Sequence, residues 1–413
     1  MTRKASFSLY FFQALYFGAW LLALPFLFFV KRLRPISRQR FGLGMPSGPF
    51  DLWIHASSVG EARLALQVLG ELPRERFPKV IVSSNTSSGM QVLESHADDQ
   101  TKLVFFPFDL LPSWSIALAR VQPRRILLLE TEIWPALLFY CRQRSIDVTI
   151  GNARMSLKSF CRYYPLSGLL SQIKPVRILS VSEKDNERFS WIFSGSDPEI
   201  MSNIKFDTVS EASPVPYVKN PLASYFKPGH PLIVLGSIRK EEEIYMRRLV
   251  KRVSSDHPKT TIALFPRHME RIKTWQEFLE NEGIPWSRRS DLENRPSLPG
   301  VILWDMFGEL VYAYALAKSV YVGGSLAPCG GQNFLEPLSQ GIVPCVGPFW
   351  DNFEWVGQEI VSSDLLCRIE DERELYARLI KPPSVSKDRV FSDFNQFIQK
   401  RQGGTRELIK KIQ

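Results

Sequence analysis

The stretch Gly323-Gly-Ser-Leu-Ala-Pro-Cys-Gly-Gly-Gln-Asn-Phe-Leu-Glu-Pro337 decides the fold that this 413-residue sequence predicts. It follows the apolar run Ser319 to Val322, which is typical of a buried strand. The four glycines permit positive φ angles and a close approach of the backbone to a ligand. A helix that begins at the end of the stretch offers unpaired N–H groups to an anion, and Glu336 in its first turn can bind the hydroxyls of a ribose. The stretch therefore indicates a site for a nucleotide-linked donor.

The spacing of these glycines argues against two common nucleotide sites. The stretch contains neither the Gly-Lys-Ser/Thr of an ATPase loop nor the Gly-x-Gly-x-x-Gly of a NAD-binding loop. A turn that only joins a strand to a helix explains the stretch equally well when it is taken alone. The rest of the chain shifts the balance between these two explanations.

Apolar runs alternate with helix-like segments along the whole chain after residue 50. The runs that we expect to be strands are 52–56, 80–84, 102–106, 126–129, 148–150 and 178–181 in the first half, and 232–236, 261–265, 301–303, 320–322 and 343–346 in the second. Amphipathic segments such as 61–72 and 135–144 lie between them. This alternation predicts an α/β protein with two doubly wound, Rossmann-like domains, whose ligands bind outside the carboxyl ends of parallel strands.

Length and composition divide the chain into five parts. Residues 1–30 are a predicted membrane anchor, residues 31–212 an N-terminal domain, and residues 232–390 a C-terminal domain. The Pro-rich stretch 213–231 is a predicted linker. The segment 391–413 reads as helical and basic, and it can pack back on the first domain. Two domains on one linker imply a cleft between them.

Charge and cysteine content restrict the partners. The net charge of +10 favours an anionic partner such as membrane lipid or a phosphorylated substrate. No Arg-rich tract, zinc-finger spacing or RNA-binding signature is present, so we expect no nucleic acid. The five cysteines are scattered and form no Cys-x-x-Cys pair, which fits a reducing compartment and argues against disulfides or a zinc site.

The N-terminus differs in composition from everything that follows. Residues 7–30 carry no charge, and their length matches the ~20 apolar residues that cross a bilayer. No signal-peptide cleavage site is evident. The basic residues that follow outnumber Arg3 and Lys4 in front: Lys31, Arg32, Arg34, Arg38 and Arg40. We therefore expect a single anchor that spans the membrane or lies in its face, with the body on the cytoplasmic side. Gln13 and Pro25 leave a buried or interfacial helix open as the alternative.

Glu61 is the candidate general base. It ends the segment His55-Ala-Ser-Ser-Val-Gly-Glu61, which follows the first predicted strand, and it lies in the first turn of the next helix. The helix dipole favours an ionised carboxylate there, which can accept the proton of an attacking sugar hydroxyl. A glutamate that only stabilises its helix is the alternative. His55 is better explained as a structural residue at a strand end.

Further candidates in the first half follow other strands. Glu130, in Glu130-Thr-Glu-Ile-Trp-Pro135, can orient an acceptor or stabilise charge, although no Asp-x-Asp metal arrangement accompanies it. The segment Asn152-Ala-Arg-Met-Ser156 can contact the same ligand. Lys205 can neutralise a leaving phosphate, and an ordinary surface lysine is the alternative.

Three strand ends of the second half also carry candidates. Arg267, in Phe265-Pro-Arg-His268, suits a phosphate or a carboxylate, and a loop arginine is the alternative. The segments Asp305-Met-Phe-Gly-Glu309 and Gly236-Ser-Ile-Arg-Lys-Glu-Glu-Glu243 turn from a strand into a helix. Several such junctions together favour a glycosyltransferase of the GT-B class.

The ordered set of these motifs resembles the Kdo (3-deoxy-D-manno-octulosonic acid) transferases of Gram-negative bacteria. The segments that carry the resemblance are 55–61, 130–135, 152–156, 205–207, 266–268, 308–310 and 323–337. The resemblance implies an enzyme of lipopolysaccharide inner-core biosynthesis at the cytoplasmic face of the inner membrane. It would transfer Kdo from CMP-Kdo, bound by the C-terminal domain, to a phosphorylated lipid A precursor, bound by the N-terminal domain.

The resemblance also assigns roles. Glu61 corresponds to the general base, and Glu130 and Lys205 to residues that stabilise the transition state. The positions that correspond to CMP binding are Pro266, Arg267, Phe307, Gly308, Glu309, Asn333, Phe334, Leu335 and Glu336. The sequence departs from relatives at Cys329-Gly-Gly-Gln-Asn333, where His-Gly-Gly-His-Asn is frequent, at Phe307, where Met is usual, and in the turn after Gly236.

The expected reaction is a direct displacement with inversion, without a metal ion or another cofactor. The leaving group carries a single phosphate, which Arg and Lys side chains and a helix N-terminus can stabilise. Two alternatives remain at this point: another GT-B enzyme that uses a UDP-sugar on a membrane lipid, and a non-catalytic membrane-anchored protein that binds a nucleotide or a lipid. The sequence leaves open whether one Kdo unit is added or more.

Overall fold

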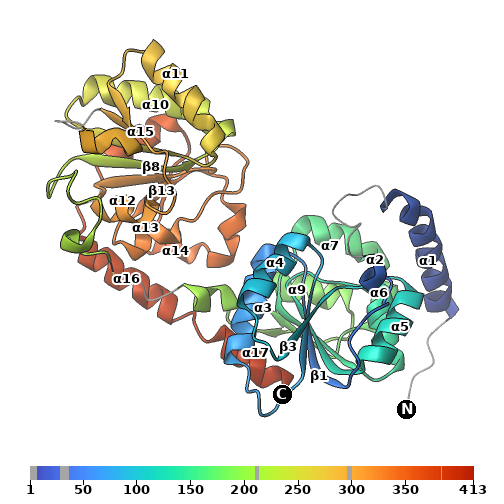
Figure 1. Ribbon diagram of the computed structural model, residues 1–413. Helices are drawn as coiled ribbons and strands as arrows, with labels where there is room; N and C mark the ends of the chain where they lie inside the picture. The colour runs from blue at the N-terminus through green and yellow to red at the C-terminus, as the bar shows by residue number, and fades with distance from the viewer. Residues whose placement is uncertain (1–6, 28–36, 210–213, 295–299, 383) are drawn as a thin grey trace. The chain divides into compact units, whose positions relative to one another are not determined.

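The computed structural model describes residues 7–27, 37–209, 214–294, 300–382 and 384–413. The chain forms two compact units (Figure 1). The first comprises Met1–Thr208 together with Arg401–Gln413, and the second comprises Val209–Lys400. Each unit contains one seven-stranded parallel sheet covered by helices on both faces, as the alternation of apolar runs predicts.

The sheet of the first unit has the order β3-β2-β1-β4-β5-β6-β7. Its strands are β1 (Phe50–Ala56), β2 (Val80–Ser84), β3 (Thr101–Phe105), β4 (Pro123–Leu129), β5 (Asp147–Ala153), β6 (Arg177–Ser180) and β7 (Glu199–Ile200). Since the chain proceeds from β1 outward to β3 and then returns to β4, the strand order reverses between β1 and β4. The loops after these two strands diverge, which leaves a crevice at their carboxyl ends.

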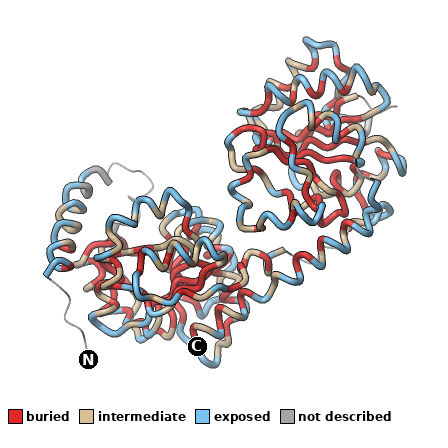
Figure 2. Tube along the Cα trace, turned by 180° about the vertical axis from the view of Figure 1, so that it is seen from behind, coloured by how far each residue is buried: buried red, intermediate tan, exposed pale blue. Residues whose placement is uncertain are grey.

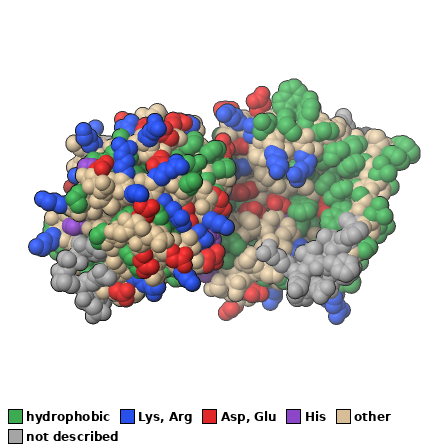
Figure 3. Space-filling model, turned by 90° about the horizontal axis from the view of Figure 1, so that it is seen from above, with side chains coloured by type: hydrophobic (Ala, Val, Ile, Leu, Met, Phe, Trp, Pro, Cys, Tyr) green, Lys and Arg blue, Asp and Glu red, His purple; other side chains and the backbone are tan. Residues whose placement is uncertain are grey.

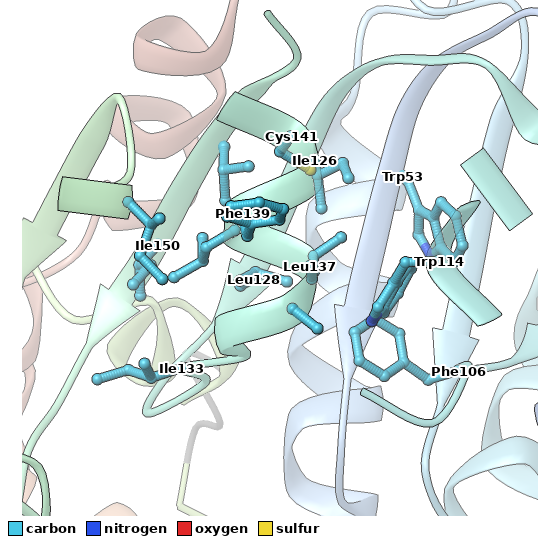
Figure 4. Close-up of a cluster of buried hydrophobic side chains, with 14 of the residues drawn as sticks. Trp53, Phe106, Trp114, Ile126, Leu128, Ile133, Leu137, Phe139, Cys141 and Ile150 are labelled. Carbon is cyan, nitrogen blue, oxygen red and sulfur yellow. The ribbon is translucent and has the colours of Figure 1, made fainter. Parts of the chain in front are cut away.

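Two layers of helices cover this sheet. The strands of this sheet are mostly buried (Figure 2). The apolar side chains of β1 and β4 alternate between two hydrophobic clusters, one on each face. One cluster, shown in Figure 4, includes Trp53, Trp114 and Leu137. The helices on that face are α5 (Leu111–Val121), α6 (Pro135–Gln143), α8 (Ser167–Leu170) and α9 (Glu183–Ile192), and those on the other are α3 (Val59–Glu71), α4 (Ser87–His96) and α17 (Gly404–Ile412).

Shorter helices complete the first unit. They are α2 (Ser37–Arg40), α7 (Leu157–Tyr163) and the 3₁₀ helices η2 (Tyr164–Leu166), η3 (Ser171–Ile173) and η4 (Ile204–Thr208). Of these, η4 contains Lys205, a candidate site residue, and α2 contains Arg40, one of the basic residues that follow the predicted anchor.

The sheet of the second unit repeats the same plan in the order β10-β11-β9-β8-β12-β13-β14. Its strands are β8 (Leu232–Ile238), β9 (Thr261–Pro266), β10 (Trp286–Arg288), β11 (Val301–Leu303), β12 (Ser319–Val322), β13 (Pro344–Val346) and β14 (Cys367–Arg368). The order reverses between β8 and β12. The turn after Gly236 and the glycine-rich stretch after Val322 therefore lie side by side at this reversal.

The second unit contains both α-helices and 3₁₀ helices. The α-helices are α10 (Glu243–Asp256), α11 (Ile272–Asn281), α12 (Leu310–Leu316), α13 (Leu335–Ser339), α14 (Glu359–Ser362), α15 (Glu372–Ile380) and α16 (Lys387–Gln399). The 3₁₀ helices are η5 (Tyr217–Lys219), η6 (Lys240–Glu242), η7 (Met269–Arg271), η8 (Arg289–Asn294) and η9 (Asp351–Val356). Helices α10, α11 and α15 share one hydrophobic cluster with the sheet.

The structure divides the chain differently from the expectation in two places. Residues 214–231 belong to the second unit, where the Asn220 side chain donates to the carbonyl of Tyr312 at 2.9 Å. The C-terminal segment is split, because α16 lies with the second unit and α17 with the first. Asp207 fixes the start of α17 by accepting hydrogen bonds from the Gly403 and Thr405 backbone N–H groups.

The apolar N-terminal segment forms α1 (Phe7–Leu27). Within the ranges that the structure describes, no helix is both long enough and apolar enough to cross a membrane. Of the predicted anchor, residues 1–6 and 28–30 lie outside the described residues, as do Lys31, Arg32 and Arg34 of the basic group behind it.

One face of α1 packs on the first unit. Leu9 and Gln13 are buried there, and the Gln13 amide donates to the carbonyl of Pro135 at 3.2 Å. The Tyr16 hydroxyl donates to Asp109 at 3.0 Å. The opposite face exposes a continuous apolar stripe that consists of Phe7, Tyr10, Phe11, Leu15, Leu21 and Leu22. Since successive residues of a helix are 100° apart, these positions lie on the side opposite Leu9, Gln13 and Tyr16, and α1 has a docked face and a bare apolar face.

Arg40 corrects one expectation about the basic group. The sequence analysis counted it among the basic residues that follow the predicted anchor, but its side chain is 3% exposed. Its guanidinium donates to the Phe106 carbonyl at 2.8 Å and to the Asn85 side chain at 2.9 Å. Burial lowers the Arg40 pKa to about 10. Arg40 is therefore part of the interior behind β1 and is not available to lipid.

The Asp109 carboxylate provides a test of how α1 is held. It accepts hydrogen bonds from the N–H groups of Ala136 and Leu137, from the Trp114 indole and from the Tyr16 hydroxyl. We predict that Asp109→Ala lowers the free energy of unfolding by more than ~3 kcal/mol, because four buried donors lose their acceptor. Tyr16→Phe removes one bond and should cost ~1 kcal/mol. Urea denaturation measures both, and equal losses would contradict this account of the contact.

Candidate functional site

Glu61 lies where the sequence predicts it, in the first turn of α3. Ser58 is the N-cap, and its hydroxyl accepts from the Glu61 N–H at 3.2 Å and lies 2.9 Å from Oε1. Oε2 accepts from the Ser57 N–H at 2.7 Å. Burial is the main cause that raises the pKa of Glu61 above its usual value, while the Ser57 bond opposes the rise. The carboxylate therefore stabilises its helix and is also a stronger base than an exposed glutamate.

Glu130 and Lys205 form an ion pair at the carboxyl end of β4. The Lys205 Nζ lies 2.5 Å from Oε1 of Glu130, and the Arg154 guanidinium lies 4.0 Å from the same oxygen. Glu130 has a φ of +61°, in the left-handed region that non-glycine residues rarely occupy. Such backbone strain persists where the surrounding structure enforces it, and it is concentrated at functional sites. The charges of Glu130 and Lys205 both act on Glu61, which places the three residues in one site.

Asn152 explains how Lys205 reaches this position. It is fully buried at the end of β5 with a φ of +53°, and its Oδ1 accepts from the Ile204 N–H at 3.0 Å. This bond fixes the start of η4, so that Lys205 points towards Glu130. The sequence indicated that the segment 152–156 can contact a ligand, but Asn152 acts as a support and Arg154 is the member that reaches the charged pair.

The structure adds Glu132, to which the sequence analysis gave no role of its own. Its side chain is 12% exposed, and its Oε2 accepts from the Trp134 indole at 2.6 Å. His55 lies behind it, fully buried and stacked on Phe106 at 3.4 Å between ring centroids. This confirms the structural interpretation of His55. The signal for Glu132 was present in the spacing Glu-x-Glu after a buried strand.

The glycine-rich stretch of the second unit is held by Glu242. The Gly324 N–H donates to Oε1 of this buried carboxylate at 2.6 Å, and the Tyr321 hydroxyl donates to Oε2 at 2.7 Å. A Cβ on Gly323 would lie 2.5 Å from the Ser237 carbonyl, so glycine is required for the close approach of the two loops. Sequence reasoning placed Glu242 among acids of a helix start but did not predict that it ties the stretch to β8.

The four predicted residues at the start of α13 fall into two kinds. The Asn333 side chain is exposed and donates to Oε1 of Glu336 at 2.9 Å, and burial raises the Glu336 pKa. Phe334 and Leu335 are buried, and Phe334 packs on the Trp350 ring. Phe334 and Leu335 can therefore contact a ligand only through their backbone, whereas Asn333 and Glu336 present polar side chains.

Pro266 and Arg267 lie at the end of β9. Pro266 is buried, and the exposed Arg267 is fixed at its backbone by the bond from its N–H to the Ile238 carbonyl at 2.8 Å. The charge of Arg267 lowers the pKa of Glu336, although burial has the larger and opposite effect. A guanidinium after β9 and a carboxylate after β12, the strands on either side of β8, thus lie at one edge of the sheet.

The predicted residues after β11 form a glycine turn. Phe307 is 81% exposed, and Gly308 has a φ of +83°. Glu309 accepts from the Trp304 indole at 2.9 Å and from Arg289 at 3.0 Å. Its carboxylate is therefore engaged with the protein, which leaves the backbone of the turn and the Phe307 ring for a ligand. Among the residues that the structure describes, no group of three or more His, Cys, Asp and Glu side chains is arranged to hold a metal ion.

Comparison with known proteins shows which enzymes this chain resembles. A family model described as 3-deoxy-D-manno-octulosonic-acid transferase (kdotransferase) matches residues 36–208. The enzyme of that name from Haemophilus influenzae is 26% identical over 370 residues, which cover 87% of this chain and 86% of that protein. The one from Bordetella pertussis is 29% identical over 349 residues, 81% of this chain and 80% of its own. The chain is therefore similar to Kdo transferases over most of its length.

The similarity to these enzymes identifies the chain as a glycosyltransferase. A solved structure supports its fold. The Anabaena protein HepE, solved in complex with UDP, has a TM-score of 0.56 to this chain at 13% identity. The match covers 88% of this chain and 98% of HepE. At this level of identity the likeness concerns the fold alone, and it agrees with the two parallel α/β sheets of the Kdo transferase described above.

The buried contact between Arg289 and Glu309 gives a prediction for the second unit. The Arg289 side chain is 8% exposed and also lies over the Tyr225 ring. We predict that Arg289→Met lowers the free energy of unfolding by ~2–3 kcal/mol, because it leaves the Glu309 carboxylate partly buried without its cation. Arg288→Met, at the exposed neighbouring position, is the matched control. Urea unfolding followed by tryptophan fluorescence measures both, and the same midpoint for the two variants would refute the expected role.

Proposed function

We propose that this enzyme transfers Kdo from CMP-Kdo to a phosphorylated lipid A precursor, as a step of lipopolysaccharide inner-core biosynthesis. The similarity to Kdo transferases supports the sugar and the pathway. The observation that carries the proposal is the arrangement of Glu61 beside the Glu130–Lys205 ion pair at the point where the strand order of the first sheet reverses. A carboxylate base next to a paired cation and anion suits a displacement in which the acceptor hydroxyl loses a proton and a phosphate departs.

The donor site that we propose lies in the second unit, at the carboxyl ends of β8, β9, β11 and β12. The residues that would bind the CMP moiety are Pro266, Arg267, Phe307, Gly308, Glu309, Asn333, Phe334, Leu335 and Glu336. Support comes from the exposed Arg267 guanidinium, which suits a phosphate, and from Glu336, which suits ribose hydroxyls. Phe334, Leu335 and Glu309 act through their backbone or by holding the turn.

The reaction that fits this site is a single displacement with inversion. An acceptor hydroxyl oxygen forms the new bond to the anomeric carbon of Kdo while the bond from that carbon to the CMP phosphate breaks. The electron pair leaves with CMP, and Glu61 takes the hydroxyl proton. Glu130 and Lys205 stabilise the charge that develops in the transition state. We propose that the protein supplies this stabilisation without a metal ion, through Lys205 and Arg267.

The exposed stripe of α1 supports a proposal for localisation. Phe11 and Leu22 are among the apolar side chains that this face leaves bare, and hydrophobic side chains gather on this side of the first unit in Figure 3. We propose that the stripe lies in the inner leaflet of the inner membrane, where the lipid acceptor is found, and that the enzyme body stays on the cytoplasmic side. The buried face with Gln13 and Tyr16 would then join the catalytic unit to the membrane surface.

Replacement of the base tests the reaction. Glu61→Gln is expected to lower kcat for Kdo transfer by 10²–10⁴-fold, roughly the share of general base catalysis, and to leave the KM for CMP-Kdo nearly unchanged. Glu71→Gln, at the other end of α3, is the control with the same chemical change. In the unmodified enzyme the rate should fall with decreasing pH at a value above that of an exposed glutamate, because the pKa of Glu61 is raised. A Glu61→Gln enzyme with full kcat would refute the assignment.

Membrane attachment is tested by charging the stripe. Phe11→Glu with Leu22→Glu removes two apolar contacts worth ~1.5 kcal/mol each and should weaken partition into liposomes by about 100-fold. Val385→Glu alters an exposed apolar residue of the second unit and should have no effect. Flotation with anionic liposomes measures the bound fraction. Undiminished flotation of the doubly substituted enzyme would show that α1 is not the attachment site.

A further inference from the structure

Asn85 lies next to the loop that presents Glu61, and it takes no part in the proposed reaction itself. It follows β2 directly, and β2 pairs with β1 so that Ser84 lies beside Ala56. Asn85 and Ser57 therefore extend from neighbouring strand ends. The Asn85 amide donates to the Ser57 hydroxyl at 2.8 Å, and the Ser57 backbone N–H donates to Oε2 of Glu61 at 2.7 Å. Asn85 thus reaches the base through a single residue.

Arg40 determines which end of the Asn85 amide faces Ser57. Its guanidinium donates to Oδ1 of Asn85 at 2.9 Å and also to the Asn85 backbone carbonyl. Because an arginine side chain carries only donors and no acceptor, the atom that faces it is the amide oxygen. The NH₂ group of Asn85 is then turned towards Ser57. The orientation of the amide therefore follows from its hydrogen-bond partners.

Arg40 is itself held firmly by the interior of the first unit. Besides Asn85, its guanidinium binds the Phe106 carbonyl at 2.8 Å, and it lies 5.6 Å from the ring centroids of both Phe105 and Phe108. The backbone carbonyl of Arg40 accepts from the Phe108 N–H at 2.7 Å. A side chain that the fold already immobilises gives up little further entropy when it binds Asn85.

His55 completes the support of Ser57. Its Nε2 lies 3.2 Å from the Ser57 hydroxyl and 3.3 Å from Nδ2 of Asn85. His55 is fully buried and stacks on the Phe106 ring. The three polar side chains thus touch one another, and two of them are fixed by buried neighbours. The place of Ser57, and with it the N–H group that Glu61 accepts from, follows from this arrangement.

We propose that Asn85, oriented by Arg40, is a positioning residue for the Glu61 base. Ser58 also contacts the Glu61 carboxylate, but Ser58 is exposed, so the contact through Ser57 is the one that the interior fixes. Without the Asn85 amide, the Ser57 hydroxyl loses its support on one side and the Ser57 N–H shifts relative to Glu61. The base is then displaced from the acceptor hydroxyl. The proposal rests on the function proposed above and extends it to a residue that acts through another.

Asn85→Leu tests this role, because leucine has a similar size and shape and cannot form the hydrogen bonds. We expect kcat for Kdo transfer to fall by about 100-fold, as when a reacting group is misplaced by roughly an ångström, while the KM for CMP-Kdo stays nearly unchanged. Asn186→Leu is the matched control and should keep its kcat, although it too removes an amide, one that donates to the Pro198 carbonyl at 3.0 Å.

A second variant attacks the same contact from its other side. Ser57→Ala removes the hydroxyl that accepts from Asn85, keeps the Ser57 N–H and leaves the contact of Asn85 with Arg40 in place. It should lose kcat to a similar extent as Asn85→Leu, so the test does not depend on one variant. Thermal unfolding of each variant checks that the fold is retained. Full kcat in a folded Asn85→Leu or Ser57→Ala enzyme would overturn the proposal.

The same substitution in an enzyme without the base shows whether Asn85 acts through Glu61. Glu61→Gln has no base left to misplace, so the addition of Asn85→Leu should cause no further loss of kcat. Two residues that act as one unit give non-additive effects in such a double-mutant cycle. If the two losses multiply instead, Asn85 acts independently of Glu61 and the proposal is wrong.

The titration of Glu61 gives a readout that needs no substrate. The bond from the Ser57 N–H favours the charged carboxylate and so lowers the pKa of Glu61, against the larger effect of burial. Loss of this bond in Asn85→Leu should therefore raise the pKa further. The substitution alters none of the charged side chains that act on Glu61, which are Glu130, Glu132 and Lys205.

Carbon-13 NMR of the full chain with carboxyl-labelled glutamate measures this titration, and the Glu61 signal is the one that is missing in Glu61→Gln. We expect a higher midpoint in Asn85→Leu than in the unmodified protein and an unchanged midpoint in Asn186→Leu. Equal midpoints in Asn85→Leu and the unmodified protein would overturn the positioning role, whatever the activity. A shifted midpoint in a protein that transfers no Kdo would support the contact and place the failure in the proposed function.

Discussion

The reversal of strand order in each parallel sheet is the constraint on which the rest of the structure depends. Between β1 and β4, and again between β8 and β12, neighbouring strands send their following loops in opposite directions. The first reversal brings Glu61 and Glu130 together, although they are far apart in sequence. The second brings the turn after Gly236 against Gly323. Every residue with a proposed chemical role in the first unit acts at or beside the first reversal.

Strained backbone positions and buried polar groups hold the charged side chains of each site in place. Glu130 and Asn152 adopt left-handed backbone conformations that cost of order 1–3 kcal/mol each, and buried hydrogen bonds keep them there. Asn152 fixes the segment that carries Lys205. In the second unit Ser237 has a φ of +57° beside the loop that Glu242 ties down. The fold thus uses strain and buried polar groups to hold charged side chains at one edge of each sheet.

The local pattern of the sequence predicts the strands and the helix starts. It does not predict contacts between residues that are far apart along the chain. All eleven predicted strands exist, and Glu61 and Glu336 lie in the first turns of helices as expected. The edge strands β7, β10 and β14 are two or three residues long and each contains a charged residue, so no apolar run reveals them. The burial of Arg40, the docking of α1 and the pairing of Lys205 with Glu130 rest on contacts between distant segments, which spacing along the chain does not encode.

The most direct test of the account is the product that the unmodified enzyme makes. Purified enzyme would be incubated with a lipid A precursor, a CMP-Kdo generating system and, once CMP-Kdo has formed, an excess of EDTA, and the product analysed by mass spectrometry and NMR. The account predicts a mass increase of whole Kdo units, an anomeric configuration opposite to that of the donor, and no effect of EDTA on transfer. Retention of the donor's configuration, or no added Kdo from folded enzyme, would contradict it.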